Sequence, residues 1–212
     1  MSIPDVRTEY GRGALNEDGA AGDPIVQFSR WFDEAKAAGV REINAMSLAT
    51  AAPDGHPDNR IVLLKQFDAS GFVFYTNYNS RKGHELLANP RACALFFWIE
   101  LERQVRIEGT VSRVSPQQSD RYFSERPLEA RLGAWASPQS EPIASRAELE
   151  ARMDAVRSRF AGQAEPPRPP NWGGYRIAPL QMEFWQGRAS RLHDRLLYVR
   201  EAGGWRRSRL AP

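Results

Sequence analysis

Apolar residues repeat at helical spacing near the start of the chain. Ile25, Phe28, Trp31, Phe32 and Ala35 follow Asp23-Pro24. This dipeptide is typical of helix starts, because Asp caps the first turn and Pro fits its first position. The pattern predicts a helix from Pro24 that packs on a core through one face. Residues 1–22 are rich in Gly, Asp and Ala, and we expect a flexible N-terminal arm there.

From Ala45 onward the pattern changes to short apolar runs, which are typical of strands. The runs span residues 46–51, 60–65, 72–77, 92–99, 104–114, 175–177, 182–185, 192–199 and 205–210. The runs 60–65 and 72–77 flank Asp68-Ala-Ser-Gly71, which predicts a hairpin between them. Helices are predicted over 80–89, 115–126, 128–135 and after Ser145. Closely spaced strands favour an antiparallel sheet or barrel, so we expect a mainly β protein with peripheral helices (α+β), with residues 23–212 as one domain.

Composition excludes several classes of protein. The 212 residues contain one cysteine, three separated histidines and no apolar run near the roughly 20 residues of a membrane helix. We therefore expect no disulfide and no metal site, and a cytoplasmic protein without a secretory signal or membrane contact. The net charge of +3 comes without a Lys/Arg run, which disfavours nucleic-acid binding. Nor is there a glycine-rich nucleotide loop.

The basic residues suggest an anionic ligand. Only three of the 29 are lysines, and arginine binds planar anions through paired hydrogen bonds. Arg81 and Lys82 begin a predicted helix, although its macrodipole disfavours cations there. A bound anion would resolve that conflict; a solvated turn is the alternative. Arg60 and Lys65 would point to opposite faces of a regular strand.

Two further groups share a face of a predicted element. Tyr122 and Arg126 are four residues apart on a helix and could grip a phosphate. Arg191, His193 and Arg195 alternate and would share one face of a strand, where like charge should lower the pKa of the histidine. A neutral histidine can accept a hydrogen bond from a substrate. The alternative for Tyr122 and Arg126 is a stack of the two side chains on the surface, and the alternative for Arg191, His193 and Arg195 is an exposed polar strand face without a ligand.

Eight segments in order make the chain similar to the pyridoxamine 5′-phosphate oxidase family. They are Arg60-Ile-Val-Leu-Leu-Lys65, Phe74-Tyr-Thr-Asn77, Ser80-Arg-Lys82, Glu102-Arg-Gln-Val105, Gly133-Ala-Trp-Ala-Ser-Pro-Gln-Ser140, Trp172-Gly-Gly174, Glu183-Phe-Trp-Gln-Gly187 and Arg191-Leu-His-Asp-Arg195. The resemblance covers essentially the whole chain. It implies an FMN-binding split β-barrel, a homodimer with FMN at the subunit interface, and oxidation of pyridoxamine or pyridoxine 5′-phosphate by O2.

The resemblance also implies roles for individual residues. Cofactor binding would fall to Arg60, Ile61, Lys65, Tyr75, Thr76, Arg81, Lys82, Gln104, Gln139, Ser140, Trp185 and Arg195. Substrate binding would fall to Lys65, Tyr122, Arg126, Arg191 and His193, with Arg7 and Tyr10 closing over the site as a lid. Arg191 and His193 would be the catalytic pair, orienting the reacting carbon of the substrate and handling the proton of its hydroxyl or amine.

One position departs from the family pattern. Ala130 stands where the family usually has a serine that contacts the substrate phosphate. A lost hydrogen bond to a charged group costs about 1.5–3 kcal/mol, or roughly 10- to 100-fold in affinity. Ala130 therefore leaves open a related flavin oxidase acting on another ring, such as a phenazine precursor. A non-catalytic flavin-, haem- or B6-phosphate-binding protein is a second alternative.

Overall fold

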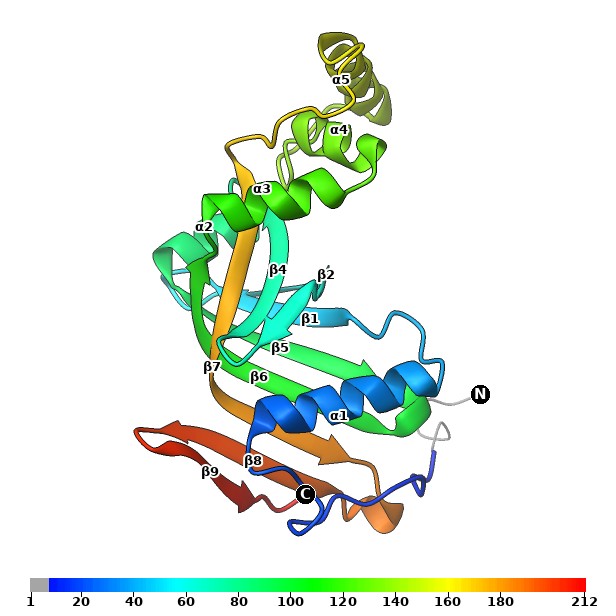
Figure 1. Ribbon diagram of the computed structural model, residues 1–212, viewed down its shortest axis with the longest axis vertical. Coiled ribbons are helices and arrows are strands. Elements are labelled where there is room, and N and C mark those ends of the chain that lie inside the picture. Colours follow the sequence, from blue (N-terminus) through cyan, green and yellow to red (C-terminus); the bar gives the residue numbers. More distant parts are fainter. Residues whose placement is uncertain (1–7) are drawn as a thin grey trace.

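The computed structural model describes residues 8–212, which form one curled antiparallel sheet with helices around it (Figure 1). The strands run in the order β2-β1-β5-β6-β7-β4-β3, and β8 and β9 continue from β7. The bounds are α1 Pro24–Ala37, β1 Ala45–Ala51, β2 Pro57–Leu63, β3 Gln66–Asp68, β4 Gly71–Asn77, α2 Arg81–Ala88, β5 Arg91–Trp98, η2 Ile99–Leu101, β6 Arg103–Arg113, α3 Pro116–Glu125, α4 Leu128–Ala136, α5 Arg146–Arg159, β7 Trp172–Gln186, η3 Ala189–Arg191, β8 Asp194–Glu201 and β9 Gly204–Arg209. The predicted mainly β class and split barrel are confirmed.

The predicted helix from Pro24 is confirmed as α1, which lies against the curled sheet (Figure 1). The Asp23 carboxylate accepts a hydrogen bond from the Ile25 N–H at 2.7 Å, which caps the helix start. Phe28 is fully buried, and its ring packs edge-on against Phe72 and Phe96 with centroids 4.9 and 5.1 Å away. Burial of each such ring contributes about 1.5–3 kcal/mol, so α1 and the sheet share one core.

Serine caps set the starts of three other helices. The hydroxyls of Ser80, Ser115 and Ser145 each accept a hydrogen bond from the backbone N–H three residues later, at 3.3, 3.1 and 3.2 Å. Each such cap is worth about 1 kcal/mol. The predicted helices over 80–89, 115–126 and after Ser145 are thereby confirmed as α2, α3 and α5, and the one over 128–135 as α4.

The predicted hairpin between residues 60–65 and 72–77 is wrong, because the run 72–77 pairs with a different segment. Residues 57–63 form β2, which pairs with β1, and the short β3 instead makes the hairpin with β4. The chain changes partner at Leu64, which is buried and donates its N–H to the Asn44 carbonyl at 2.8 Å. Lys65 then donates to Val73. Arg60 consequently lies on β2, whereas Lys65 lies in the connection between β2 and β3.

Strand β7 is one 15-residue strand where the sequence predicts two shorter ones. Pro179 lacks an N–H, yet β7 continues through it because the pairing with β6 shifts register between Glu108 and Gly109. A Cβ on Gly109 would lie 2.1 Å from the Ala178 carbonyl oxygen. Glycine therefore permits this bulge, and the bulge lets one strand cross both halves of the sheet.

Residues 8–22 of the predicted arm lie along the C-terminal strands. Leu15 N–H donates to Asp194 at 3.0 Å, and the Tyr198 hydroxyl donates to the Ala21 carbonyl at 2.7 Å. Arg209 pairs with Glu17 at 2.7 Å. The arm's flexibility and the boundary at residue 22 stay predictions, and Arg7 lies outside the described residues. Among residues 8–212, no helix is long and apolar enough to cross a membrane.

Candidate active site

A cluster of cations surrounds the start of α2. Arg81, in the first turn of the helix, places Nε 3.1 Å from Glu85 and 3.2 Å from Asp58. Arg60 reaches the same two carboxylates from β2 and donates to the Thr50 hydroxyl at 2.5 Å. Arg60 and Arg81, which the resemblance assigns to cofactor binding, therefore lie side by side, and two acidic residues hold both guanidinium groups in place.

Lys82 differs from its neighbours because its ammonium group is buried without a matching charge. The residue is 8% exposed, and its Nζ has only long contacts of 3.4–3.5 Å to Thr76, Ser80 and Gln139. In the described part of the chain, no carboxylate oxygen comes within 4.0 Å of it. Burial lowers the pKa of Lys82 and the nearby Arg60 lowers it further, while the more distant Asp58 and Glu85 oppose these effects only in part. Since a buried charge is costly without a partner, this site fits an anion.

Gln139 and Ser140 complete this cation cluster. Gln139 accepts a hydrogen bond from the Thr76 hydroxyl at 3.0 Å, which ties the loop after α4 to β4. Ser140 follows in a left-handed conformation with φ 74° and is exposed. Gln139 also lies 3.4 Å from the Lys82 ammonium group, and Ser140 is the next residue along the loop.

A stack of aromatic rings lies beside the cation cluster. Tyr75 on β4 stacks on Tyr122 of α3 with centroids 4.0 Å apart, and on Trp172 of β7 at 5.5 Å. Arg126 lies over the Trp172 ring at 4.6 Å. Its Nη1 atom is buried and has no hydrogen-bond partner in the described residues, and burial lowers its pKa. A buried orphan guanidinium nitrogen also fits an anion.

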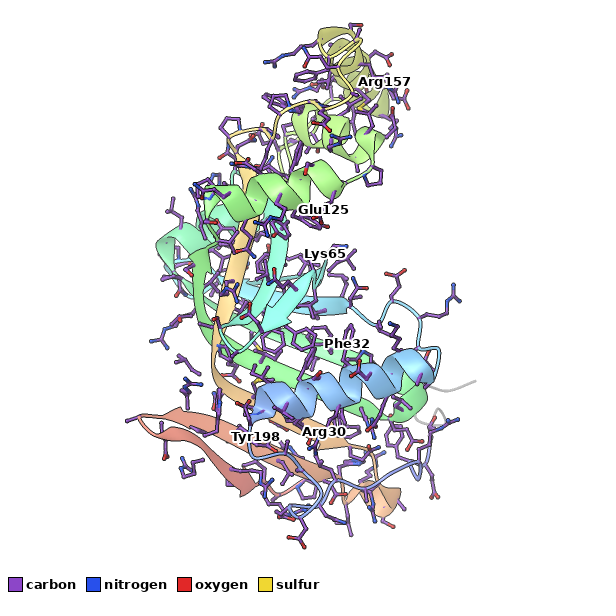
Figure 2. The ribbon with its side chains drawn as sticks, viewed as in Figure 1. Arg30, Phe32, Lys65, Glu125, Arg157 and Tyr198 are labelled. Atoms are coloured by element: carbon purple, nitrogen blue, oxygen red, sulfur yellow. The ribbon has the colours of Figure 1, made fainter. Side chains whose placement is uncertain are left out.

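Lys65 joins Tyr75 and Tyr122 in lining a polar cavity of about 380 Å³. Glu125 lines the same cavity, and Figure 2 shows it with Lys65 on the side where α3 faces the sheet. Lys65, Tyr122 and Tyr75 therefore lie around one cavity. Arg126, which the resemblance groups with Lys65 and Tyr122, does not line this cavity and lies over Trp172 instead.

A second group lies on the outer face of the sheet. Gln104 pairs with Trp185 across β6 and β7, and Trp185 pairs with Arg195 across β7 and β8. All three line a cavity of about 360 Å³. The Arg195 Nε donates to the buried Glu183 at 2.7 Å, which fixes the guanidinium. Ile61 on β2 is 67% exposed and pairs with Ser47 of β1, which in turn pairs with Leu95 of β5. Leu95 lines the same cavity as Gln104, so Ile61 lies on this face of the sheet.

Arg191 and His193 occupy a turn before β8. The predicted strand face shared by Arg191, His193 and Arg195 is wrong, because β8 begins only at Asp194 and Arg191 has a φ of 61°. Arg191 and His193 nevertheless line one cavity of about 690 Å³, together with Tyr10. The turn, rather than strand alternation, brings them together.

The His193 ring has a defined orientation. The Arg188 backbone N–H donates to Nδ1 at 3.1 Å, so a neutral ring carries its proton on Nε2. Burial lowers the pKa of His193, and Arg191 lowers it further. The predicted direction is confirmed, with burial as the larger cause. A neutral His193 would donate through Nε2, whereas the sequence suggested that it accepts.

The site residues fall into two groups at opposite ends of β7. The cation cluster and the aromatic stack lie where β4 pairs with Trp172, and the group with Gln104, His193 and Tyr10 lies near Trp185. Thirteen residues of strand, at about 3.3 Å each, separate the two tryptophans by up to roughly 40 Å. Figure 1 shows α3 and β8 at opposite ends of β7. One chain does not bring the two groups together.

Sequence reasoning missed several acidic residues of the site. Asp58 and Glu85 hold the two arginines, and Glu183 holds Arg195. Glu102 accepts hydrogen bonds from Gly11 and Arg12. Glu85 could have been found, because it lies four residues after Arg81, a spacing at which opposite charges pair on a helix.

Comparisons with known proteins show which family this chain resembles. Residues 32–160 match the family model described as pyridoxamine 5′-phosphate oxidase, and residues 172–212 match the pyridoxine 5′-phosphate oxidase C-terminal dimerisation region. Curated proteins named pyridoxine/pyridoxamine 5′-phosphate oxidase are 61% identical in Bordetella petrii (100% of both chains) and 62% identical in Rubrobacter xylanophilus (99% of this chain, 96% of the relative).

Solved structures show the same fold. PhzG from Burkholderia lata, solved in complex with tetrahydrophenazine-1-carboxylic acid, is 33% identical with a TM-score of 0.88 and covers 95% of this chain and 100% of its own. An FMN-binding protein from Nostoc punctiforme related to pyridoxamine 5′-phosphate oxidase is 20% identical with a TM-score of 0.70, over 87% of this chain and 97% of its own. The chain belongs to the pyridoxamine 5′-phosphate oxidase family.

Proposed function

We propose that this chain is an FMN-dependent oxidase that converts pyridoxamine 5′-phosphate and pyridoxine 5′-phosphate to pyridoxal 5′-phosphate. O2 accepts the electrons and becomes H2O2, and the amine substrate also consumes water and releases ammonia. The observation that carries the proposal is a pair of separate cations without an anionic partner among the described residues: Lys82, which is buried, and Arg126, whose Nη1 atom is buried. Such cations suit two phosphates, one from the cofactor and one from the substrate.

The residues present fit FMN. Arg60, Arg81 and Lys82 would hold its phosphate, because they gather donors at the start of α2, where a helix favours an anion. The remaining contacts would come from Ile61, Lys65, Tyr75, Thr76, Gln104, Gln139, Ser140, Trp185 and Arg195. When bound, FMN supplies the two-electron acceptor of the reaction, while the protein supplies position and electrostatics.

The phosphorylated substrate would be held by its two ends. Lys65, Tyr122 and Arg126 would bind the phosphate. Arg191 and His193 would bind the pyridine ring and its reacting substituent, with Tyr10 covering them. Because Nδ1 of His193 accepts the Arg188 N–H, its Nε2–H would donate to an oxygen or nitrogen of the substrate. His193 would then orient the ring first, and take part in proton transfer only after its tautomer changes.

A second copy of the chain would complete each site. The two groups of residues lie at opposite ends of β7, and one isoalloxazine ring with its phosphate is far shorter than that strand. A homodimer that brings the cation cluster of one protomer to the Trp185 end of its partner would unite them. The match of residues 172–212 to a dimerisation region supports this arrangement.

Anaerobic mixing tests the proposed reaction. FMN-loaded protein is mixed with pyridoxamine 5′-phosphate while the visible flavin absorbance is followed. We expect rapid bleaching, recovery on admitting O2, and stoichiometric H2O2. Bound flavin that stays yellow would refute the substrate assignment and leave the cofactor site standing. His193→Ala should slow this reduction more than it weakens FMN binding.

The likeness to PhzG keeps a second function open. That structure holds a tetrahydrophenazine, and Ala130 removes a hydroxyl from the proposed phosphate site. Ala130→Ser separates the two functions. For a B6-phosphate oxidase we expect substrate binding to tighten roughly 10-fold or more, with FMN affinity unchanged. Bleaching by a dihydrophenazine acid, with none by pyridoxamine 5′-phosphate, would favour the phenazine-type oxidase. Absence of H2O2 with either compound would favour a binding protein.

A further inference from the structure

Glu102 is a buried acidic residue that the proposed reaction does not use. It lies in the turn between η2 and β6, in a left-handed conformation with φ 55° and ψ 42°, and is 8% exposed. Residues other than glycine seldom adopt this conformation. A strained backbone together with a buried carboxylate indicates that surrounding contacts hold Glu102 in place.

Those contacts come from the N-terminal arm. The Glu102 Oε2 atom accepts hydrogen bonds from the backbone N–H of Gly11 at 2.8 Å and of Arg12 at 2.9 Å. In the described part of the chain, no lysine, arginine or histidine nitrogen lies within 4.0 Å of its carboxylate. The negative charge is therefore satisfied by two backbone N–H groups, which is a strong, charge-assisted arrangement.

These two hydrogen bonds fix the residue before them. The Tyr10 ring packs edge-on against Trp185 at 5.7 Å and against His193 at 5.9 Å. Gly187 leaves room for it, since a Cβ there would lie 2.8 Å from Cβ of Tyr10 and 3.0 Å from Cβ of Glu102. The Gly187 N–H also donates to the Glu102 carbonyl at 2.8 Å. Tyr10, Glu102 and Gly187 thus form one packed unit.

We propose that Glu102 is a positioning residue, which holds the arm so that Tyr10 covers Trp185 and His193. The inference rests on the proposed function, in which those residues meet flavin and substrate. Glu102 acts through the backbone of Gly11 and Arg12 and touches neither ligand.

The effect of losing Glu102 should be local. Further along the arm, Leu15 N–H is held by Asp194 at 3.0 Å and Glu17 by Arg209 at 2.7 Å. These contacts do not involve Glu102. Substitution of Glu102 should therefore release the chain only as far as about residue 13, leaving the rest of the arm on β8 and β9.

The test uses the FMN-loaded full chain with Glu102→Ala, Tyr10→Ala and the double variant. NMR signals of the His193 ring report the nearby Tyr10 ring without needing activity. We expect Glu102→Ala to shift them as Tyr10→Ala does, and trypsin to cut after Arg12 at least about 10-fold faster. Each single variant should raise the KM for pyridoxamine 5′-phosphate, with no additional rise in the double variant.

Two further variants keep the test decisive. Glu17→Ala also removes an arm contact and should leave the His193 signals and KM unchanged. Glu102→Gln keeps an acceptor oxygen, so it should give a smaller shift than Glu102→Ala; it also serves if Glu102→Ala does not fold. His193 signals that match wild type in both Glu102 variants, or additive effects on KM, would overturn the proposal. If wild type does not oxidise the substrate, the proposed function fails, and the NMR and trypsin results still decide the role of Glu102.

Discussion

Replacing Lys82 with methionine should stabilise the cofactor-free protein while weakening FMN binding. Methionine has a similar length and helix propensity, so the substitution mainly removes the charge. Lys82 is 8% exposed, with contacts no shorter than 3.4 Å and no carboxylate within 4.0 Å in the described residues. The ammonium group therefore carries a desolvation cost that the more distant Asp58 and Glu85 only partly offset, since the pKa of Lys82 stays lowered.

The two effects can be estimated separately. Removing a cation from a helix start gains about 0.3–1 kcal/mol, and relief of the burial cost adds to this. A net gain of about 1 kcal/mol corresponds to a rise in Tm of roughly 2–4 °C for a chain of this size. A hydrogen bond to a charged group is worth about 1.5–3 kcal/mol, so the Kd for FMN should rise roughly 10- to 100-fold.

Arg60→Met provides the matched control. Arg60, which is 18% exposed, pairs with the buried Glu85 and with Asp58. Its removal leaves Arg81 as the remaining partner of both carboxylates, so we expect a loss of about 1–3 kcal/mol. Both variants should weaken FMN binding, measured by flavin fluorescence quenching. Thermal unfolding of the cofactor-free proteins should show opposite changes, with Tm raised in Lys82→Met and lowered in Arg60→Met.

The sign of the Tm change is the critical result. A lower Tm in cofactor-free Lys82→Met, with an unchanged Kd for FMN, would show that Lys82 stabilises the fold itself. The reasoning from an unpartnered buried cation to an anion site would then be refuted at this position.

Two other predictions concern the bulge and the histidine. Gly109→Ala should lower the free energy of unfolding in urea by about 1–3 kcal/mol or more, because its Cβ would lie 2.1 Å from the Ala178 carbonyl oxygen. Gly133→Ala is the control: it lies within α4, its Cβ would have nothing within 4 Å, and it should raise the free energy of unfolding by about 0.5–1 kcal/mol. Equal losses of stability in the two variants would contradict this reasoning. His193 should titrate by NMR below its ordinary pKa of 6.5 and carry its proton on Nε2 when neutral. Since the folded protein disfavours the charged ring, the contribution of His193 to stability is complete above pH 6.5 and is lost as the pH falls through the pKa of the folded state. A measured pKa above 6.5, or a proton on Nδ1, would contradict the contacts described.

Local sequence signals located most elements because the forces behind them are local. Asp23-Pro24, Ser80 and Ser115 each begin a helix, since a side-chain oxygen accepts a backbone N–H within the first turn. Which strands pair with each other was harder to predict from the sequence. The run 60–65 has strand character, but the pattern alone did not show that it pairs with the preceding strand β1 rather than with the following run 72–77.

The site shows the same division. Tyr122 and Arg126 could be placed on one helix from their spacing, whereas the positions of Arg191 and His193 follow from a left-handed turn that alternation did not reveal. Glu102 gave a sequence signal only as part of a motif. Its hydrogen bonds reach residues 91 and 90 positions away, a separation that no periodicity reports.

The sequence by itself determined the helix starts, the strand-rich class and the kinds of side chain available for binding anions, because these follow from local backbone chemistry and residue type. Only the tertiary structure decided which cations are neutralised and which are left without a partner: Arg60 found two carboxylates, and Lys82 found none within 4.0 Å in the described residues. It also decided that the candidate site residues separate to the two ends of β7. The reason is that burial and charge pairing depend on distances through space, which chain order does not fix.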